Sequence, residues 1–173
     1  SCPRINAQLG MGVAPLAEFL NNGLRVGLGT DSPAATDSTD MISEMHIGML
    51  IQRAVNPRSF MKSSTMLEMA TIGGARALRM DDKVGSLEVG KAADLFLVDI
   101  AGLEYSGTLH DPQSLLARCG VTDRVWMTMI GGNVVYADGK LTGVDERTLA
   151  REAEATCTRV LRNRVPYFPK FGA

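Results

Sequence analysis

The chain has 173 residues, of which 45% are hydrophobic and 21% are charged, and this is enough for one ordinary domain or two small ones. Its formal net charge of −1 gives no electrostatic basis for binding nucleic acid or an anionic membrane. We therefore expect small-molecule or protein partners.

The cysteines and the N-terminal residues indicate a reduced, cytoplasmic protein. Cys2, Cys119 and Cys157 are odd in number and widely spaced, which favours neither a disulfide framework nor a zinc knuckle. No apolar stretch approaches the roughly 20 residues of a transmembrane helix, and the first residues carry no secretory pattern. Because the sequence does not begin with Met, we expect a fragment of a longer protein.

The first predicted elements are a helix over residues 15–22 and a strand over residues 24–30. The helix has a proline at its first position and ends at Gly23. The apolar run that follows is short and bounded by turn residues, so it predicts a buried strand. In parallel sheets and barrels the chemistry lies at the carboxyl ends of strands, which is where this strand would place Asp31.

A polar loop over residues 32–40 precedes a second helix, expected over residues 41–54. The hydroxyls and carboxylates of the loop can cap this helix. An apolar stripe at helical spacing includes Ile42, Met45 and Met49. The stripe predicts that the helix packs on the outside of a layer of strands.

Two shorter helical segments follow. Thr65 and Glu68 fit a capping box, which predicts a helix over about residues 66–72. We expect the Gly-Gly pair at residues 73–74 to break or reorient this helix before residues 75–78, whose small side chains let helices approach closely.

From Lys83 the pattern changes from helix to strand and turn, which we interpret as a domain boundary. A small antiparallel module is predicted from strands over residues 95–98, 125–130 and 133–136, with a further turn at residues 138–139. Residues 103–119 connect its parts, with a short helix starting at Pro112.

The last predicted element is an amphipathic helix over residues 146–162, capped by Asp145. The aromatic tail at residues 167–171 is interrupted by proline. We expect this tail to pack on a neighbouring surface or to stay mobile.

Three stretches resemble the amidohydrolase superfamily. Leu-Gly-Thr-Asp at residues 28–31, together with residues 40–53, is similar to the last barrel strand and following helix of its aminohydrolase branch, which contains purine-type deaminases and triazine hydrolases. Ala-Thr-Ile-Gly-Gly-Ala-Arg-Ala-Leu at residues 70–78, followed by residues 85–95, is similar to the stretch that joins barrel to β-sandwich. Residues 2–6 resemble the His-Cys-Pro-x-Ser-Asn motif, with Ser1 in place of the His and Ile5 in place of the Ser.

The resemblance implies an α/β fold: the last part of a metal-dependent (β/α)8 barrel, followed by the C-terminal part of a small β-sandwich. We accordingly divide the chain into a barrel portion (1–82), a sandwich portion (83–143, with a connection at about 103–120) and a terminal helix and tail (144–173). Barrel domains run to about 250 residues, so we expect roughly the last two-fifths of a larger enzyme.

The resemblance also implies site residues. Asp31 would ligate, or lie beside, a single divalent metal, zinc or iron, and accept a proton from the attacking water. A metal lowers the pKa of bound water towards about 7, so a neighbouring base can generate hydroxide. Asn6, Ser32 and His110 are candidates for the substrate side. The family's His-x-His pair, its further His and its acid/base Glu have no match here, so the chain alone is expected to bind no metal tightly and to be inactive.

Three further residues leave alternatives open. His46 is interpreted as a packing or surface residue, and His110 as a structural loop residue or a remote substrate contact. Glu44 either belongs to its helix alone or braces the loop that carries Asp31.

The predicted function is that of part of a hydrolase that deaminates a nitrogen heterocycle with metal-activated water. The alternatives are an amide or cyclic-imide hydrolase of the same superfamily, and a noncatalytic remnant or binding module. As partners we expect a small heterocyclic substrate, the missing N-terminal part of the barrel and further copies in a homo-oligomer, with no nucleic acid and no membrane.

Overall fold

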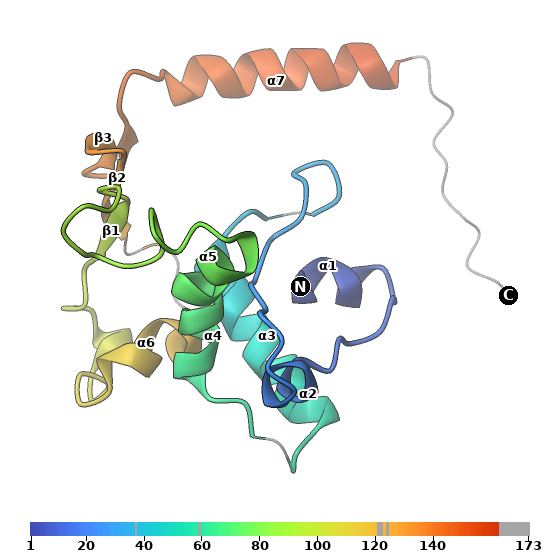
Figure 1. Cartoon of the computed structure of the whole chain (residues 1–173). Helices are drawn as coiled ribbons and strands as arrows, with labels where there is room; N and C mark the ends of the chain where they lie inside the picture. The colour runs from blue at the N-terminus through green and yellow to red at the C-terminus, as the bar shows by residue number, and fades with distance from the viewer. Residues whose placement is uncertain (37, 59, 121–122, 124, 163–173) are drawn as a thin grey trace, which may run out of the picture.

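The computed structural model of the chain describes residues 1–36, 38–58, 60–120, 123 and 125–162. It has a helical part followed by a small sheet and a long final helix (Figure 1). The helices are α1 (Pro3–Gln8), α2 (Leu16–Asn21), α3 (Met41–Val55), α4 (Ser63–Ala70), α5 (Ile72–Leu78), the 3-10 helix η1 (Leu103–Tyr105), α6 (Pro112–Cys119) and α7 (Glu146–Leu161). The strands are β1 (Leu95–Val98), β2 (Val125–Ile130), β3 (Asn133–Ala137) and β4 (Lys140–Leu141).

The core of the helical part lies between α2, α3, α4 and α6. Its largest buried side chains come from leucine and methionine residues at helical spacing, namely Leu16, Met45, Met49, Met66 and Met69. The predicted apolar stripe of α3 is therefore confirmed as a packing surface, but its buried neighbours come from α2, α4 and α6 and not from the predicted layer of strands. The predicted cap is confirmed as well, because Asp40 Oδ1 accepts hydrogen bonds from the backbone N–H groups of Ile42 (2.9 Å) and Ser43 (3.3 Å).

The prediction of a buried strand at residues 24–30 is wrong for this chain. The sheet in the described part of the chain contains only β1–β4, and Leu24 is 54% exposed. Val26 and Leu28 pack on the helical core from one side, so the segment is half-buried. A strand needs a neighbouring strand to satisfy its backbone groups, and this segment lacks one among the described residues.

The predicted capping box at Thr65 is also wrong. Helix α4 begins earlier, at Ser63, so Thr65 lies inside it and the cap position falls on Lys62. The Glu68 carboxylate instead forms an ion pair with Arg76 at 3.1 Å. Burial explains the earlier start, since Ser63 is only 2% exposed and faces the core side of the helix.

The break between α4 and α5 lies at Thr71 and not at the predicted glycine pair. Thr71 has φ −124° and ψ −108°, and both glycines belong to α5. Their lack of side chains serves packing, because a Cβ placed on Gly27 would come within 2.8 Å of the Gly74 Cα. The close approach therefore occurs at Gly74 and with the segment at 24–30, and not, as predicted, between helices at residues 75–78.

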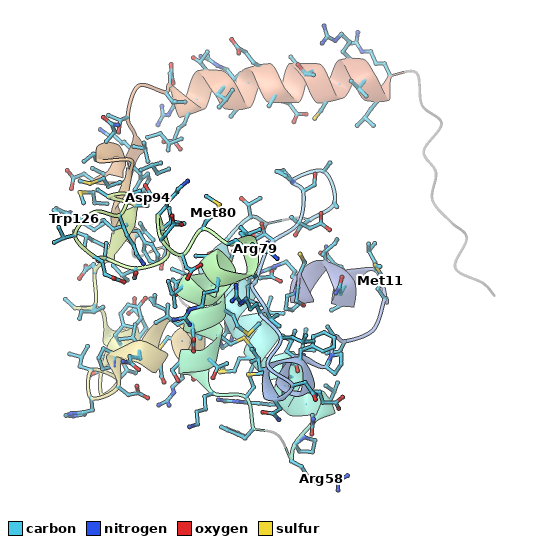
Figure 2. All side chains as sticks on the ribbon, in the orientation of Figure 1. Met11, Arg58, Arg79, Met80, Asp94 and Trp126 are labelled. Carbon is cyan, nitrogen blue, oxygen red and sulfur yellow. The ribbon has the colours of Figure 1, made fainter. Side chains whose placement is uncertain are left out.

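The sheet confirms the predicted antiparallel module. Its strands follow the order β1-β2-β3-β4, each antiparallel to the next. Gly131 and Gly132 join β2 to β3 with φ values of +54° and +80°, as a tight hairpin turn of type I′ requires. Trp126 of β2 is 53% exposed and lies on the outer side of the sheet (Figure 2). Residues 103–119 connect β1 to β2 through η1 and α6, as predicted.

Helix α7 confirms the predicted final helix and its cap. Asp145 Oδ1 accepts hydrogen bonds from the backbone N–H groups of Arg147 (3.1 Å) and Thr148 (3.2 Å). The helix buries no residue, and Figure 1 shows it standing apart from α1–α6. The prediction for residues 167–171 lies outside the described residues. No helix within the described ranges is both long enough and apolar enough to cross a membrane.

Candidate active site

The candidate catalytic residue, Asp31, lies in a turn after the segment at 24–30. It is exposed and has a φ of +65°, a left-handed conformation that Asp adopts more readily than most residues with a side chain. The Ser32 backbone N–H donates a hydrogen bond to Asp31 Oδ1 at 2.6 Å. Among the described residues this is the only hydrogen bond to the carboxylate, so Oδ2 is available to a ligand.

Ser1 pairs with the end of the same segment. Its amino group donates to the Gly27 carbonyl at 2.8 Å, and the Gly29 N–H donates to the Ser1 carbonyl at 2.9 Å. In parallel strands, the N–H and C=O groups of one residue bond to the residues immediately before and after its opposite neighbour on the other strand. The chain at Ser1 therefore runs parallel to the segment that ends in Asp31.

Helix α1 begins directly after this pairing, beside the candidate site. A Cβ placed on Gly29 would lie 3.5 Å from the Cys2 Sγ. A groove of about 680 Å³ is lined by Asn6 of α1, by residues 24–29 and by parts of α2 and α5. Asn6, a predicted substrate-side residue, and Gly29 thus line the same groove.

A second groove follows the start of the segment. It has a volume of about 520 Å³ and is lined by Leu24, Arg25 and Val26 together with residues of α2, α4 and α5. The segment at 24–30 therefore has open space beside it as well as the helical core on one side.

Of the other predicted residues, Ser32 lies next to Asp31, whereas His46 and His110 lie elsewhere. The Ser32 hydroxyl accepts a hydrogen bond from the Ala34 N–H at 3.2 Å within the exposed turn after Asp31. His110 is exposed in the turn before α6. The His46 Nδ1 lies 2.8 Å from the Ala117 carbonyl and the ring packs against Gly120, so His46 links α3 to α6 as a packing residue, as predicted.

Glu44 has a role that the sequence did not reveal. It is fully buried (0% exposed), and its Oε1 accepts a hydrogen bond from the backbone N–H of Arg4 at 2.8 Å. The Arg4 Nε lies 3.6 Å from Glu44 Oε2, and the guanidinium also donates to the Ser43 hydroxyl. Neither predicted alternative describes these contacts, because they join α3 to α1 and not to the loop that carries Asp31. In the sequence, this role could have been found from the spacing of Glu44 and Gly48. They are four residues apart and so lie on the same face of α3, which is buried.

Burial raises the pKa of the Glu44 carboxyl above its ordinary value, and the neighbouring Arg4 opposes this shift. Glu44 Oε2 and Arg4 Nε are buried without a hydrogen-bond partner among the described residues. An ion pair of this kind compensates only part of the cost of desolvating its two charges.

The residues present do not by themselves fit a metal ion. Among the described residues, no group of three or more His, Cys, Asp and Glu side chains is arranged to hold one. A catalytic zinc site takes three such protein ligands. Asp31 supplies one carboxylate, whereas the His46 ring contacts the Ala117 carbonyl of α6 and His110 is exposed in the turn before that helix.

Comparison with known sequences gives close relatives. The sequence model of the Amidohydrolase family matches residues 1–135. The chain is 35% identical to a 5-methylthioadenosine/S-adenosylhomocysteine deaminase of Desulforudis audaxviator, covering 93% of this chain and 37% of that protein. It is 37% identical to a hydroxydechloroatrazine ethylaminohydrolase of Pseudomonas sp. (strain ADP), covering 92% of this chain and 34% of that protein. The chain therefore spans little more than a third of the relatives it matches.

Comparison with solved structures agrees. An adenosine deaminase from Xanthomonas campestris, solved with bound zinc, superposes with a TM-score of 0.87 at 32% identity, covering 93% of this chain and 37% of that one. An atrazine chlorohydrolase from Arthrobacter aurescens TC1, solved in complex with zinc, superposes with a TM-score of 0.80 at 28% identity, covering 89% of this chain and 34% of that one.

Proposed function

Because the chain belongs to the amidohydrolase family, we propose that it forms the C-terminal part of a hydrolase that cleaves a C–N bond of a nitrogen heterocycle. The observation that carries the proposal is the placement of Asp31 at the end of a segment that pairs in parallel with Ser1. The relatives named above are deaminases and triazine-type hydrolases, which supports this class of reaction.

We propose further that residues 24–30 become the last strand of a (β/α)8 barrel once the complete enzyme supplies its neighbours. Parallel pairing with Ser1 is what a barrel requires, and the second groove, beside residues 24–26, leaves room for an adjoining strand. The sheet β1–β4 would then belong to the β-sandwich, with the domain boundary near Lys83. The exposed outer side of this sheet is consistent with a missing second layer.

In this proposal Asp31 accepts one proton of the attacking water as its oxygen bonds to the electron-poor ring carbon. That proton is then delivered to the amino group, so that the C–N bond breaks and ammonia leaves. An ionised carboxylate can take that proton, whereas the amide of Asn cannot. We propose one divalent ion for the complete enzyme, as zinc occurs in the related structures, with most of its ligands from outside this chain. Asn6 is the substrate-side candidate with most support, because it shares a groove with Gly29.

The test is ammonia release by the complete polypeptide with purine, pterin and triazine amines as substrates. Asp31→Asn is expected to lower turnover about 10²–10⁴-fold, the usual contribution of a positioned acid or base. Because Asp31 is exposed, the variant should unfold at the same temperature as the parent. Asp138→Asn is the matched control, since Asp138 also lies in a turn with positive φ (+50°) but in the sheet, and it should leave turnover unchanged.

The same screen, extended to cyclic imides, separates the competing functions. Near-normal ammonia release by Asp31→Asn would remove Asp31 from the mechanism. Hydrolysis of a cyclic imide without ammonia would favour the imide-hydrolase alternative. No turnover of any substrate class would favour the noncatalytic alternative.

A further inference from the structure

We propose that Glu44 is a positioning residue: its carboxylate holds α1 against α3 and thereby places Asn6 beside the segment that ends in Asp31. The structural half of this inference concerns α1 and α3 alone. Its consequence for substrate binding rests on the proposed function.

The N-terminus of α1 is capped by a residue of another helix. Cys2 stands at the cap position of this helix and makes no side-chain cap. The N–H groups of a first helical turn have no partner within their own helix, and a neighbouring oxygen must accept them if they are buried. For Arg4 this oxygen is Oε1 of Glu44, 40 residues away on α3, at 2.8 Å. A side chain of α3 therefore does what a local cap residue would do elsewhere.

One helical turn further along α3, Gly48 packs closely against Pro3 of α1. A Cβ placed on Gly48 would come 3.1 Å from the Cγ of Pro3, the first residue of α1. Glu44 and Gly48 are four residues apart and so lie on one face of α3. This face holds α1 at two points, one polar and one by close packing.

The residues just before α1 contact the segment that ends in Asp31. Ser1 is hydrogen-bonded to Gly27 and Gly29, and Cys2 lies against Gly29. Asn6, in the middle of α1, lines the groove that Gly29 also lines. Movement of α1 relative to α3 would therefore move Asn6 relative to the Asp31 segment, and displacement of a substrate contact weakens substrate binding.

The experiment uses the complete polypeptide and three variants. Glu44→Leu removes the acceptor for the Arg4 N–H and is expected to raise KM at least about tenfold with a smaller change in kcat. Glu44→Gln keeps an acceptor oxygen at the same place and should hold KM within about threefold. His46→Leu is the matched control, because His46 links α3 to α6 and not to α1, and it should lower Tm without changing KM.

Amide hydrogen exchange supplies a readout that does not depend on activity. Glu44→Leu should speed exchange in residues 3–8, whereas His46→Leu should speed it in α6. If exchange follows this pattern but no substrate is turned over, the structural half stands and the proposed function fails. If exchange in α1 is unchanged in Glu44→Leu, the positioning role itself is overturned.

A second variant keeps the inference testable if Glu44→Leu does not fold. Gly48→Ala leaves the charges in place but puts a methyl group against Pro3, so that α1 must shift by a few tenths of an ångström. KM should then rise about threefold or more. An unchanged KM in Gly48→Ala, or equal losses in Glu44→Gln and Glu44→Leu, would overturn the inference.

Discussion

The helical part and the sheet with α7 follow the same local rules but differ in burial. In the described chain, every buried hydrophobic residue lies outside β1–β4 and α7, in α1–α6, η1 or the loop before α4. Even α6, which the chain inserts between β1 and β2, packs on α3 and α4. Among the described residues, the sheet and α7 thus contain no buried hydrophobic residue, and the core lies in the helical part.

The two N-terminal caps by aspartate show this difference most directly. Asp40 on α3 and Asp145 on α7 accept hydrogen bonds from corresponding backbone groups at similar distances. Helix α3 buries six residues and α7 buries none. The cap of α3 therefore contributes to the stability of the whole helical part, whereas the cap of α7 stabilises only α7.

The largest expected effect is loss of a core side chain. Met66→Ala in α4 removes a fully buried side chain (0% exposed) and should lower the free energy of unfolding by about 2–5 kcal/mol. Trp126→Ala in β2 should change it by less than about 1 kcal/mol, because this residue is half-exposed. Urea denaturation of the 173-residue chain, followed by circular dichroism, measures both. Equal decreases in the free energy of unfolding for the two variants would show that the sheet unfolds together with the helical core.

The next effect compares the two caps. Asp40→Ala should lower the free energy of unfolding by about 1 kcal/mol, the usual value for a lost cap. Asp145→Ala should leave the unfolding midpoint unchanged and speed amide exchange within α7 only. A shift of the midpoint by Asp145→Ala would mean that α7 is coupled to the helical part.

The smallest effect is the dependence of stability on pH. Burial raises the pKa of Glu44 above 4.5, so the native state binds this proton more tightly than the unfolded state. Its contribution is complete below pH 4.5 and is lost as pH rises through the raised native pKa. Glu44→Gln cannot titrate and should remove this decline, which urea denaturation over a pH series measures. A wild-type curve parallel to that of Glu44→Gln would contradict the expectation.

Asp145 should show the opposite sign. A hydrogen bond from the Thr148 hydroxyl, with others from the backbone, lowers the pKa of this exposed carboxyl below 3.8. The native state therefore favours the ionised form, and the contribution is present above pH 3.8 and lost as pH falls through the lowered pKa. The loss should appear in the helicity of α7, and Asp145→Asn should lack it.

Features predicted correctly are those whose signals lie within a few residues of one another. The glycine pair between β2 and β3 permits the positive φ values of its turn, and Asp40 and Asp145 reach N–H groups two and three residues ahead. The role of Asp31 stays a prediction, because the structure shows only that this residue follows a segment whose residues 24–29 line the groove. Family resemblance, and not spacing, assigned its chemistry.

Features predicted wrongly depend on contacts that a local pattern does not contain. A Thr and a Glu three residues apart match a capping box at residues 65–68, but burial of Ser63 starts α4 earlier. The apolar run at 24–30 has the composition of a strand, yet a strand exists only where a neighbour accepts its hydrogen bonds. The described chain supplies Ser1 alone on that side.

The sequence by itself determined the apolar stripe of α3, the hairpin, the two aspartate caps and the family to which the chain belongs. These follow from side-chain periodicity, backbone conformational preference and motif, all of which act over short stretches. Only the tertiary structure decided that Glu44 caps α1 and that Gly27 meets Gly74. These contacts join residues more than 35 positions apart, and their energies arise from burial, which exists only once the chain has folded.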